Sequence, residues 1–147
     1  MKGSLLILIA VGLMALAGCA TVSRGTYDFG TAGAPPTDIA IIRPANEDER
    51  QYKPSVAARI FAKPAGIAQV QYLVPGNDVG LEKDVRGYSS IRVPSGSYLV
   101  RVLCHVGGFS EWFDVRINAE AGRQSLLECV GATGNNGRVT VREIDAK

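Results

Sequence analysis

Residues 88–105 read YSSIRVPSGSYLVRVLCH, in which apolar and polar side chains alternate on both sides of a Pro-Ser-Gly segment. Successive side chains of a β-strand point to opposite faces of its sheet, so this alternation predicts strands at Tyr88–Val93 and Ser97–His105. The segment between them, Pro94-Ser95-Gly96, has the composition of a tight turn. One face of the second strand would be apolar and buried, and its residues are Tyr98, Val100, Val102 and Cys104.

The same alternation continues along the chain. Toward the C-terminus it predicts strands at Glu111–Asn118, Arg123–Val130 and Arg138–Ile144, and earlier at Asp38–Arg43, Val56–Ala62 and Ile67–Val74. Gly-rich and Pro-containing turns separate these stretches. Many short strands at this spacing, in a chain of 147 residues, predict one all-β domain, an antiparallel β-sandwich of about seven strands.

The N-terminal residues have the pattern of an export signal. Lys2 precedes the apolar run Leu5–Ala17, which is shorter than the about 20 residues that a membrane-spanning helix needs. The run ends in Leu16-Ala17-Gly18-Cys19, which resembles the lipobox of bacterial lipoproteins. The resemblance implies cleavage before Cys19 and acylation of its thiol and its new amine, with a diacylglycerol group on the sulfur. Two or three acyl chains anchor a protein stably to a membrane. The alternative is an ordinary signal peptide followed by an unrelated cysteine.

The residue after Cys19 bears on the destination. In lipoproteins of this kind an Asp at that position resembles an inner-membrane retention signal, and this chain has Ala20 instead. We therefore expect the bacterial outer membrane, with the domain in the periplasm. Residues 20–37 are rich in Gly, Ser, Thr and Pro and have no apolar period. The expected organisation is a signal peptide over 1–18, a lipidated flexible tether over 19–37 and a β-sandwich domain over 38–147.

The cysteine count agrees with an exported protein. If Cys19 carries lipid, Cys104 and Cys129 remain as an even pair in an oxidising compartment. Both lie in predicted strands, so we expect a structural disulfide between them. The alternatives are a redox pair, which usually has Cys-x-x-Cys spacing, and a metal site. A zinc site would need further ligands, and the single histidine, His105, points to the opposite strand face from Cys104.

The faces opposite the predicted core are more apolar than the solvated side of a sheet usually is. An apolar patch with charged neighbours is typical of a partner surface, in which Trp and Arg are frequent anchors. The predicted partner-binding residues are Leu99, Leu103, Trp112 and Leu126. The alternative is that a second layer, or the N-terminal strands, covers these side chains.

Part of the chain resembles a known family. The turn and strand at Val93–Tyr98, and the stretch Val115–Gln124, are similar to the PEGA-like and carboxypeptidase-regulatory-like sandwich modules of bacterial envelope lipoproteins. The resemblance implies a β-sandwich that carries interactions and has no catalytic activity. Residues 52–60, YKPSVAARI, also resemble part of small transthyretin-like lipoproteins of secretion machineries.

No stretch has the pattern of a catalytic site. Ser110 is close enough in sequence to reach His105 across a hairpin, but no G-x-S-x-G motif surrounds a serine. The net charge of +2 weighs against nucleic acid as a partner.

We expect a non-enzymatic interaction or accessory module without metal or cofactor, bound to the membrane by its lipid and to an unidentified envelope protein. The alternative is a periplasmic inhibitor or small-ligand-binding lipoprotein that inserts a loop, 105–110 or 132–136, into a partner.

Overall fold

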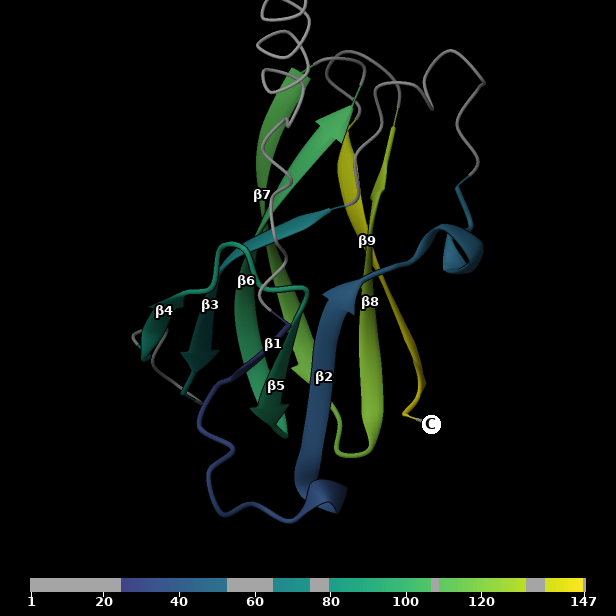
Figure 1. The fold of residues 1–147 in the computed structure, drawn as a ribbon. Helices are drawn as coiled ribbons and strands as arrows, with labels where there is room; N and C mark the ends of the chain where they lie inside the picture. Colours follow the sequence, from purple (N-terminus) through teal and green to yellow (C-terminus); the bar gives the residue numbers. More distant parts are fainter. Residues whose placement is uncertain (1–24, 53–64, 75–79, 107–108, 132–136, 147) are drawn as a thin grey trace, which may run out of the picture.

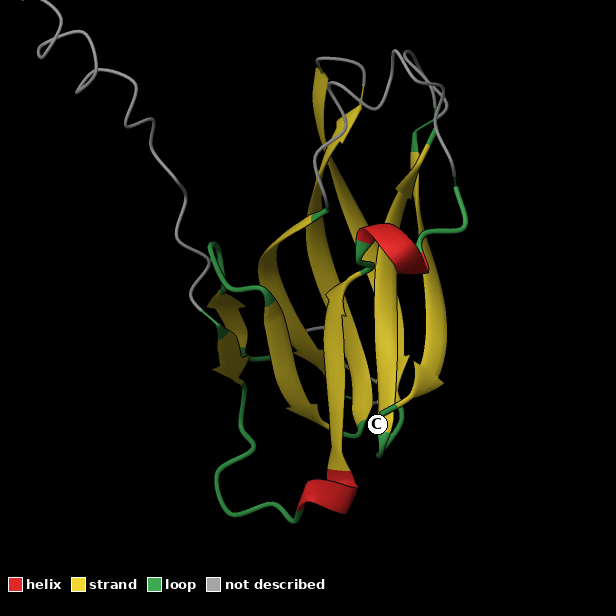
Figure 2. Cartoon of the chain, turned by 45° about the vertical axis from the view of Figure 1, so that its right-hand side comes forward, coloured by secondary structure: helices red, strands yellow, loops and turns green. Residues whose placement is uncertain are grey.

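The computed structural model describes residues 25–52, 65–74, 80–106, 109–131 and 137–146. Within these residues the chain forms two β-sheets that pack against each other, and two short 3-10 helices, Pro36–Asp38 and Glu47–Glu49, interrupt the strands (Figures 1 and 2). The predicted all-β sandwich is therefore confirmed. None of the helices in this described part has the length and apolar character that a membrane crossing requires.

The two sheets differ in size and order. The five-stranded sheet has the order β1 (Thr26–Asp28), β5 (Ser90–Pro94), β2 (Ile39–Pro44), β8 (Arg123–Val130) and β9 (Arg138–Asp145). The four-stranded sheet has the order β4 (Glu82–Asp84), β3 (Gly66–Leu73), β6 (Gly96–Val106) and β7 (Phe109–Ala119).

The strand pairing is less regular than predicted. The described residues hold nine strands, where about seven were expected, and the predicted strand Val56–Ala62 lies outside them. Two pairs, β1 with β5 and β2 with β8, are parallel, so the larger sheet is mixed. Both parallel pairs join strands that are far apart in sequence. An alternating pattern identifies a strand and its buried face, but the direction of such a distant partner depends on the path of the chain between them.

The domain begins before residue 38, so part of the predicted tether over 19–37 belongs to the sandwich. Strand β1 lies beside β5, with Tyr27 opposite Ile91. Phe29 is 6% exposed and its ring meets that of Tyr98 edge-on, at 6.0 Å between centroids. Strand β1 has three residues, which is too short to show an alternation of apolar and polar side chains. The Gly- and Pro-rich composition around it is typical of a flexible tether, so the sequence predicts no strand there. The signal segment, Cys19 and the rest of the tether lie outside the described residues.

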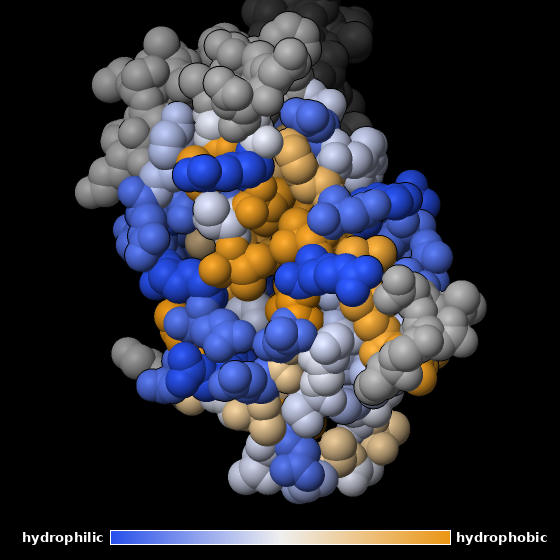
Figure 3. All heavy atoms as spheres, turned by 180° about the vertical axis from the view of Figure 1, so that it is seen from behind, coloured by the Kyte–Doolittle hydropathy of each residue, from blue (hydrophilic) through white to orange (hydrophobic). Residues whose placement is uncertain are grey.

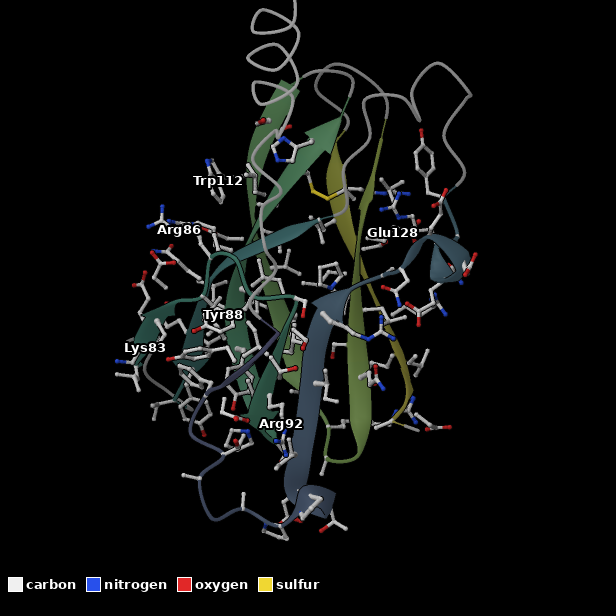
Figure 4. The ribbon with its side chains drawn as sticks, in the orientation of Figure 1. Lys83, Arg86, Tyr88, Arg92, Trp112 and Glu128 are labelled. Carbon is white, nitrogen blue, oxygen red and sulfur yellow. A yellow bond between two sulfur atoms is a disulfide. The ribbon has the colours of Figure 1, made fainter. Side chains whose placement is uncertain are left out.

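The core lies between the sheets, where the alternation in β6 placed it. Its four predicted inward residues, Tyr98, Val100, Val102 and Cys104, are each at most 1% exposed. The predicted disulfide is present: Cys104 of β6 is bonded to Cys129 of β8, with 5.8 Å between their Cα atoms (Figure 4). The bond therefore joins the four-stranded sheet to the five-stranded sheet across the core.

A short segment, the strap (residues 45–52), is held on the outer face of β8. The Glu128 carboxylate is only 8% exposed and accepts hydrogen bonds from the backbone N–H groups of Gln51 and Tyr52, at 3.1 and 2.7 Å. Within the strap, the Glu49 carboxylate accepts hydrogen bonds from two N–H groups of Arg43 of β2, at 2.6 and 2.7 Å. These bonds satisfy a buried carboxylate and fix the backbone of the strap.

Leu126 is buried by this arrangement. It faces outward on β8 between Arg43 of β2 and Arg142 of β9, and both arginines donate hydrogen bonds to Glu49 of the strap. Only 1% of Leu126 is exposed. The expectation that Leu126 belongs to a partner surface is therefore wrong, because the strap and the arginine side chains already cover this face.

The Arg43–Glu49 pair makes stability depend on pH. The guanidinium of Arg43, aided by the backbone N–H of Asn46, lowers the pKa of Glu49 from its ordinary 4.5 to about 2. A carboxylate whose pKa is lower in the folded state contributes its full stability above the unfolded pKa and loses it as pH falls through the folded pKa. We expect the free energy of unfolding to decrease from about pH 5 to about pH 2, and Glu49→Gln to make that decrease shallower.

Denaturant unfolding at a series of pH values measures this effect. Glu47→Gln is the matched control, because Glu47 lies exposed in the same short helix and makes no hydrogen bond to Arg43. A Glu49→Gln protein with an acid transition as steep as that of the unmodified chain would contradict the assignment.

Candidate functional site

The outer face of the four-stranded sheet carries the other three predicted partner residues. Leu103 of β6 is directly opposite Trp112 of β7, and Leu99 lies four residues earlier on the same face of β6. Leu126 is on the other sheet, so the structure brings together three of the four predicted residues. Seen from behind, hydrophobic residues gather in the middle of the molecule, and hydrophilic side chains surround and interrupt them (Figure 3).

Trp112 is the most unusual residue on this face. Its side chain is the largest in the chain, and 52% of it is exposed. Leu103 is partly buried opposite Trp112, and Leu99 is partly buried further along the same face of β6, beyond Arg101. In Figure 4 the indole and Arg86 lie close together on the outside of the sheet. An exposed aromatic ring with apolar neighbours is typical of a contact surface, since burying it in a complex would release water from a large apolar area.

A row of polar side chains crosses the sheet next to the indole. Arg101 of β6 lies between Gln69 of β3 and Asp114 of β7, in register with both. Its guanidinium donates from Nε and Nη2 to the two Asp114 oxygens, at 2.7 and 2.9 Å, and from Nη1 to Gln69 Oε1, at 3.1 Å. A bidentate pair of this kind fixes the plane of both groups. The row therefore presents three planar polar groups in a defined orientation.

Arg86 also lies at this surface, in the turn that follows β4. It follows β4 and reaches back to Asp84, donating from Nε at 2.9 Å and also from Nη2. Together these side chains surround an open hollow of about 360 Å³. The residues that line it are Ala68, Gln69, Arg86, Arg101, Trp112 and Asp114.

The hollow exists because β3 is irregular at this point. The register of β3 against β6 shifts between Ile67 and Gln69, which leaves Ala68 as an extra residue in a bulge. Ala68 is buried and has only a methyl side chain, so it lines the bottom of the hollow, and the longer side chains around it form the walls. A regular strand with a long side chain here would fill the space that the pocket occupies.

The charges of the site are paired with each other. Hydrogen bonding to Arg101 lowers the pKa of Asp114, and hydrogen bonding to Arg86 lowers the pKa of Asp84 to about 2. Both carboxylates are therefore ionised at neutral pH, and each has its own guanidinium. The site presents many hydrogen-bonding groups but almost no net charge.

A scan against protein-family models, a search of curated proteins and a search of solved structures each found no match to the chain.

The histidine and serine singled out in the sequence do meet. Ser110 Oγ lies 2.8 Å from His105 Nδ1, because the two residues are opposite each other on β7 and β6. No carboxylate in the described part of the chain hydrogen-bonds to the imidazole. The described residues also contain no cluster of three His, Cys, Asp or Glu side chains that could hold a metal ion. The loop 132–136 lies outside the described residues.

Sequence reasoning missed part of this site. Arg101 and Asp114 could have been found, since they occupy the same alternating faces of their strands as Leu99 and Trp112. Arg86 and Ala68 could not, because one follows a three-residue strand and the other is the bulge residue. Neither position is marked by any periodicity.

Proposed function

We propose that the protein is a non-enzymatic binding module of the bacterial cell envelope, anchored to a membrane by lipid on Cys19. In this proposal the outer face of the four-stranded sheet binds another envelope component. The observation that carries it is the half-exposed Trp112, which lies opposite Leu103 and lines a hollow together with the Arg101–Asp114 ion pair.

The contrast between the two outer faces supports this choice. On the five-stranded sheet the strap covers Leu126, and buried hydrogen bonds hold the strap in place. On the four-stranded sheet Trp112 is exposed, and so are Arg101 and Asp114. A chain that covers one apolar outer face with its own backbone and leaves an indole open on the other has a surface suited to a partner.

The lipid anchor has a physical role in the proposal. Residues Leu16–Cys19 resemble a lipobox, and acylation would hold the domain within a short distance of the membrane. Confinement raises the effective concentration of an envelope partner, so a surface of modest affinity is sufficient. The disulfide fits the same compartment, because such bonds persist where the environment is oxidising.

Trp112→Ala is expected to weaken binding to the envelope component at least tenfold and to change the free energy of unfolding by less than about 1 kcal/mol. The reason is that half of the indole already faces water, so its loss leaves no large cavity. The measurement is in-cell photo-cross-linking of the full chain from a photoreactive residue at position 103, next to Trp112.

The same photoreactive residue at position 141 is the control, because Val141 is also exposed but lies on β9 of the other sheet. We expect one dominant product from position 103, as a protein band or as material that sediments with the cell wall, and none from position 141. We also expect Trp112→Ala to remove it. Equal products from both positions would refute the surface, and collapse of the fold in Trp112→Ala would make Trp112 a core residue.

Cys19→Ser should move the protein from the membrane to the soluble fraction, and continued membrane attachment would refute the anchor.

A further inference from the structure

We infer that the hollow beside Trp112 binds the sugar rings of an uncharged polysaccharide or oligosaccharide. This inference rests on the proposed binding function and names the ligand class of the same surface.

The exposed indole is suited to a sugar ring. A pyranose carries C–H groups on one face and hydroxyl groups around its edge. The face of an aromatic ring is electron-rich and attracts such weakly positive C–H groups, and the flat contact removes apolar area of both partners from water. Trp112 offers such a face at the edge of the hollow, with 52% of the side chain exposed.

The polar row is suited to the hydroxyl groups. Gln69, Arg101 and Asp114 are planar groups with pairs of donors or acceptors, and neighbouring hydroxyls of a sugar match such pairs. The row crosses β3, β6 and β7, so at the usual strand spacing it extends over about 10 Å. That length is on the scale of two linked hexose rings. The mutual hydrogen bonds fix these groups before a ligand arrives, which reduces the entropy lost on binding.

Charge pairing points to a neutral ligand. An anionic ligand would meet each guanidinium already paired with a carboxylate, and a cation would meet each carboxylate already paired with an arginine. A hydroxyl-rich neutral ligand does not depend on an unpaired charge. Each carboxylate oxygen has a second lone pair that can accept a hydrogen bond from a sugar hydroxyl. Arg86 binds Asp84 through Nε and Nη2, so its Nη1 can donate to a hydroxyl while the ion pair stays intact.

The open shape of the site agrees with a chain as the ligand. The hollow of about 360 Å³ lies on the surface of the sheet, and Leu103 stands opposite Trp112 beside it. A linear glycan can place one or two rings over the indole and continue in both directions. A proline-rich peptide is the other extended ligand that stacks on tryptophan, but such a peptide presents only carbonyl acceptors along most of its length. It could not donate to the second lone pairs of the Asp114 and Gln69 oxygens, whose first hydrogen bonds come from Arg101.

The chain allows a direct test, because Trp112 is its only tryptophan and its fluorescence reports on this site alone. The full chain, held in a detergent without a sugar head group, is titrated with chitohexaose, cellohexaose and a proline-rich decapeptide. We expect a saturable change in emission with at least one of the two hexasaccharides, with a dissociation constant of about 0.1 mM, and none with the peptide.

Calorimetry then compares variants. We expect Trp112→Ala to weaken hexasaccharide binding at least tenfold, Gln69→Ala to weaken it about threefold or more, and Val141→Ala on the other sheet to leave it unchanged. Glycan binding that survives Trp112→Ala would place the ligand elsewhere and overturn the inference, as would Trp112-dependent binding of the peptide. If neither hexasaccharide binds but cross-linking from position 103 persists and depends on Trp112, the ligand class is wrong and the proposed function stands. If both assays fail, the proposed function fails too.

Discussion

Replacing Cys104 and Cys129 together by alanine is expected to lower the free energy of unfolding by about 3.5 kcal/mol. The bond closes a loop with a sequence separation of 25, and its loss lets the unfolded chain regain the corresponding conformational entropy. It also joins β6 to β8, so the two sheets lose their covalent link across the core. Denaturant unfolding of the variant and of the unmodified chain, with and without a reducing agent, measures the difference.

Two comparisons make this result specific. His105→Ala is the matched control, because His105 follows Cys104 on β6 but faces outward, and its removal is expected to change stability by less than about 1 kcal/mol. Reduction of the unmodified chain should reproduce most of the loss seen in the double variant. If the variant unfolds within about 1 kcal/mol of the oxidised protein, packing between the sheets holds them without help from the bond.

Tyr98→Ala is expected to destabilise the domain by about 4 kcal/mol, because it removes the largest fully buried side chain among the described residues. The ring packs between Phe29 and Tyr72, at centroid distances of 6.0 and 5.4 Å. Its hydroxyl donates a hydrogen bond to the carbonyl of Pro94 at 2.8 Å. Burial raises the pKa of Tyr98 to about 12, so the phenol stays protonated and remains a donor throughout the physiological range.

Tyr98→Phe separates the two contributions of this residue. It keeps the ring and removes the hydrogen bond, so we expect a loss of about 1 kcal/mol. The alanine variant should also loosen β1, since Phe29 would lose its contact with the ring. Hydrogen exchange of the backbone amides of residues 26–29 measures that loosening. Equal losses in the two variants would show that the hydroxyl, and not the packing of the ring, accounts for the stability.

Much of the core could be predicted because strand geometry is local. Alternation with a period of two decides which side chains of a strand share a face, and no distant residue changes that rule. The inward set of β6, which includes Cys104, follows from it. So does the shared outward face of Trp112 and Asp114, on which the candidate site is built.

The errors arose where that rule ends. The period of two separates the inner from the outer face of a strand, but it does not say which sheet the strand joins. Alternation predicts an outward position for both Leu126 and Trp112, but the structure places the two residues on different sheets. The period of two also does not predict which segment covers an outer face. The strap that covers Leu126 is held by backbone N–H groups, which every residue type except proline has, so no residue pattern marks it in the sequence.

The amino-acid sequence by itself determined the all-β class, the inward faces and the outward position of Trp112, because each depends on neighbours along one strand. The pairing of Cys104 with Cys129 followed from the cysteine count, with Cys19 assigned to the lipid. Only the tertiary structure decided the parallel partners of β1 and β2, the cover over Leu126 and the hollow at Ala68. Those features join segments tens of residues apart. Their register depends on the packing of the whole sandwich, which no local periodicity encodes.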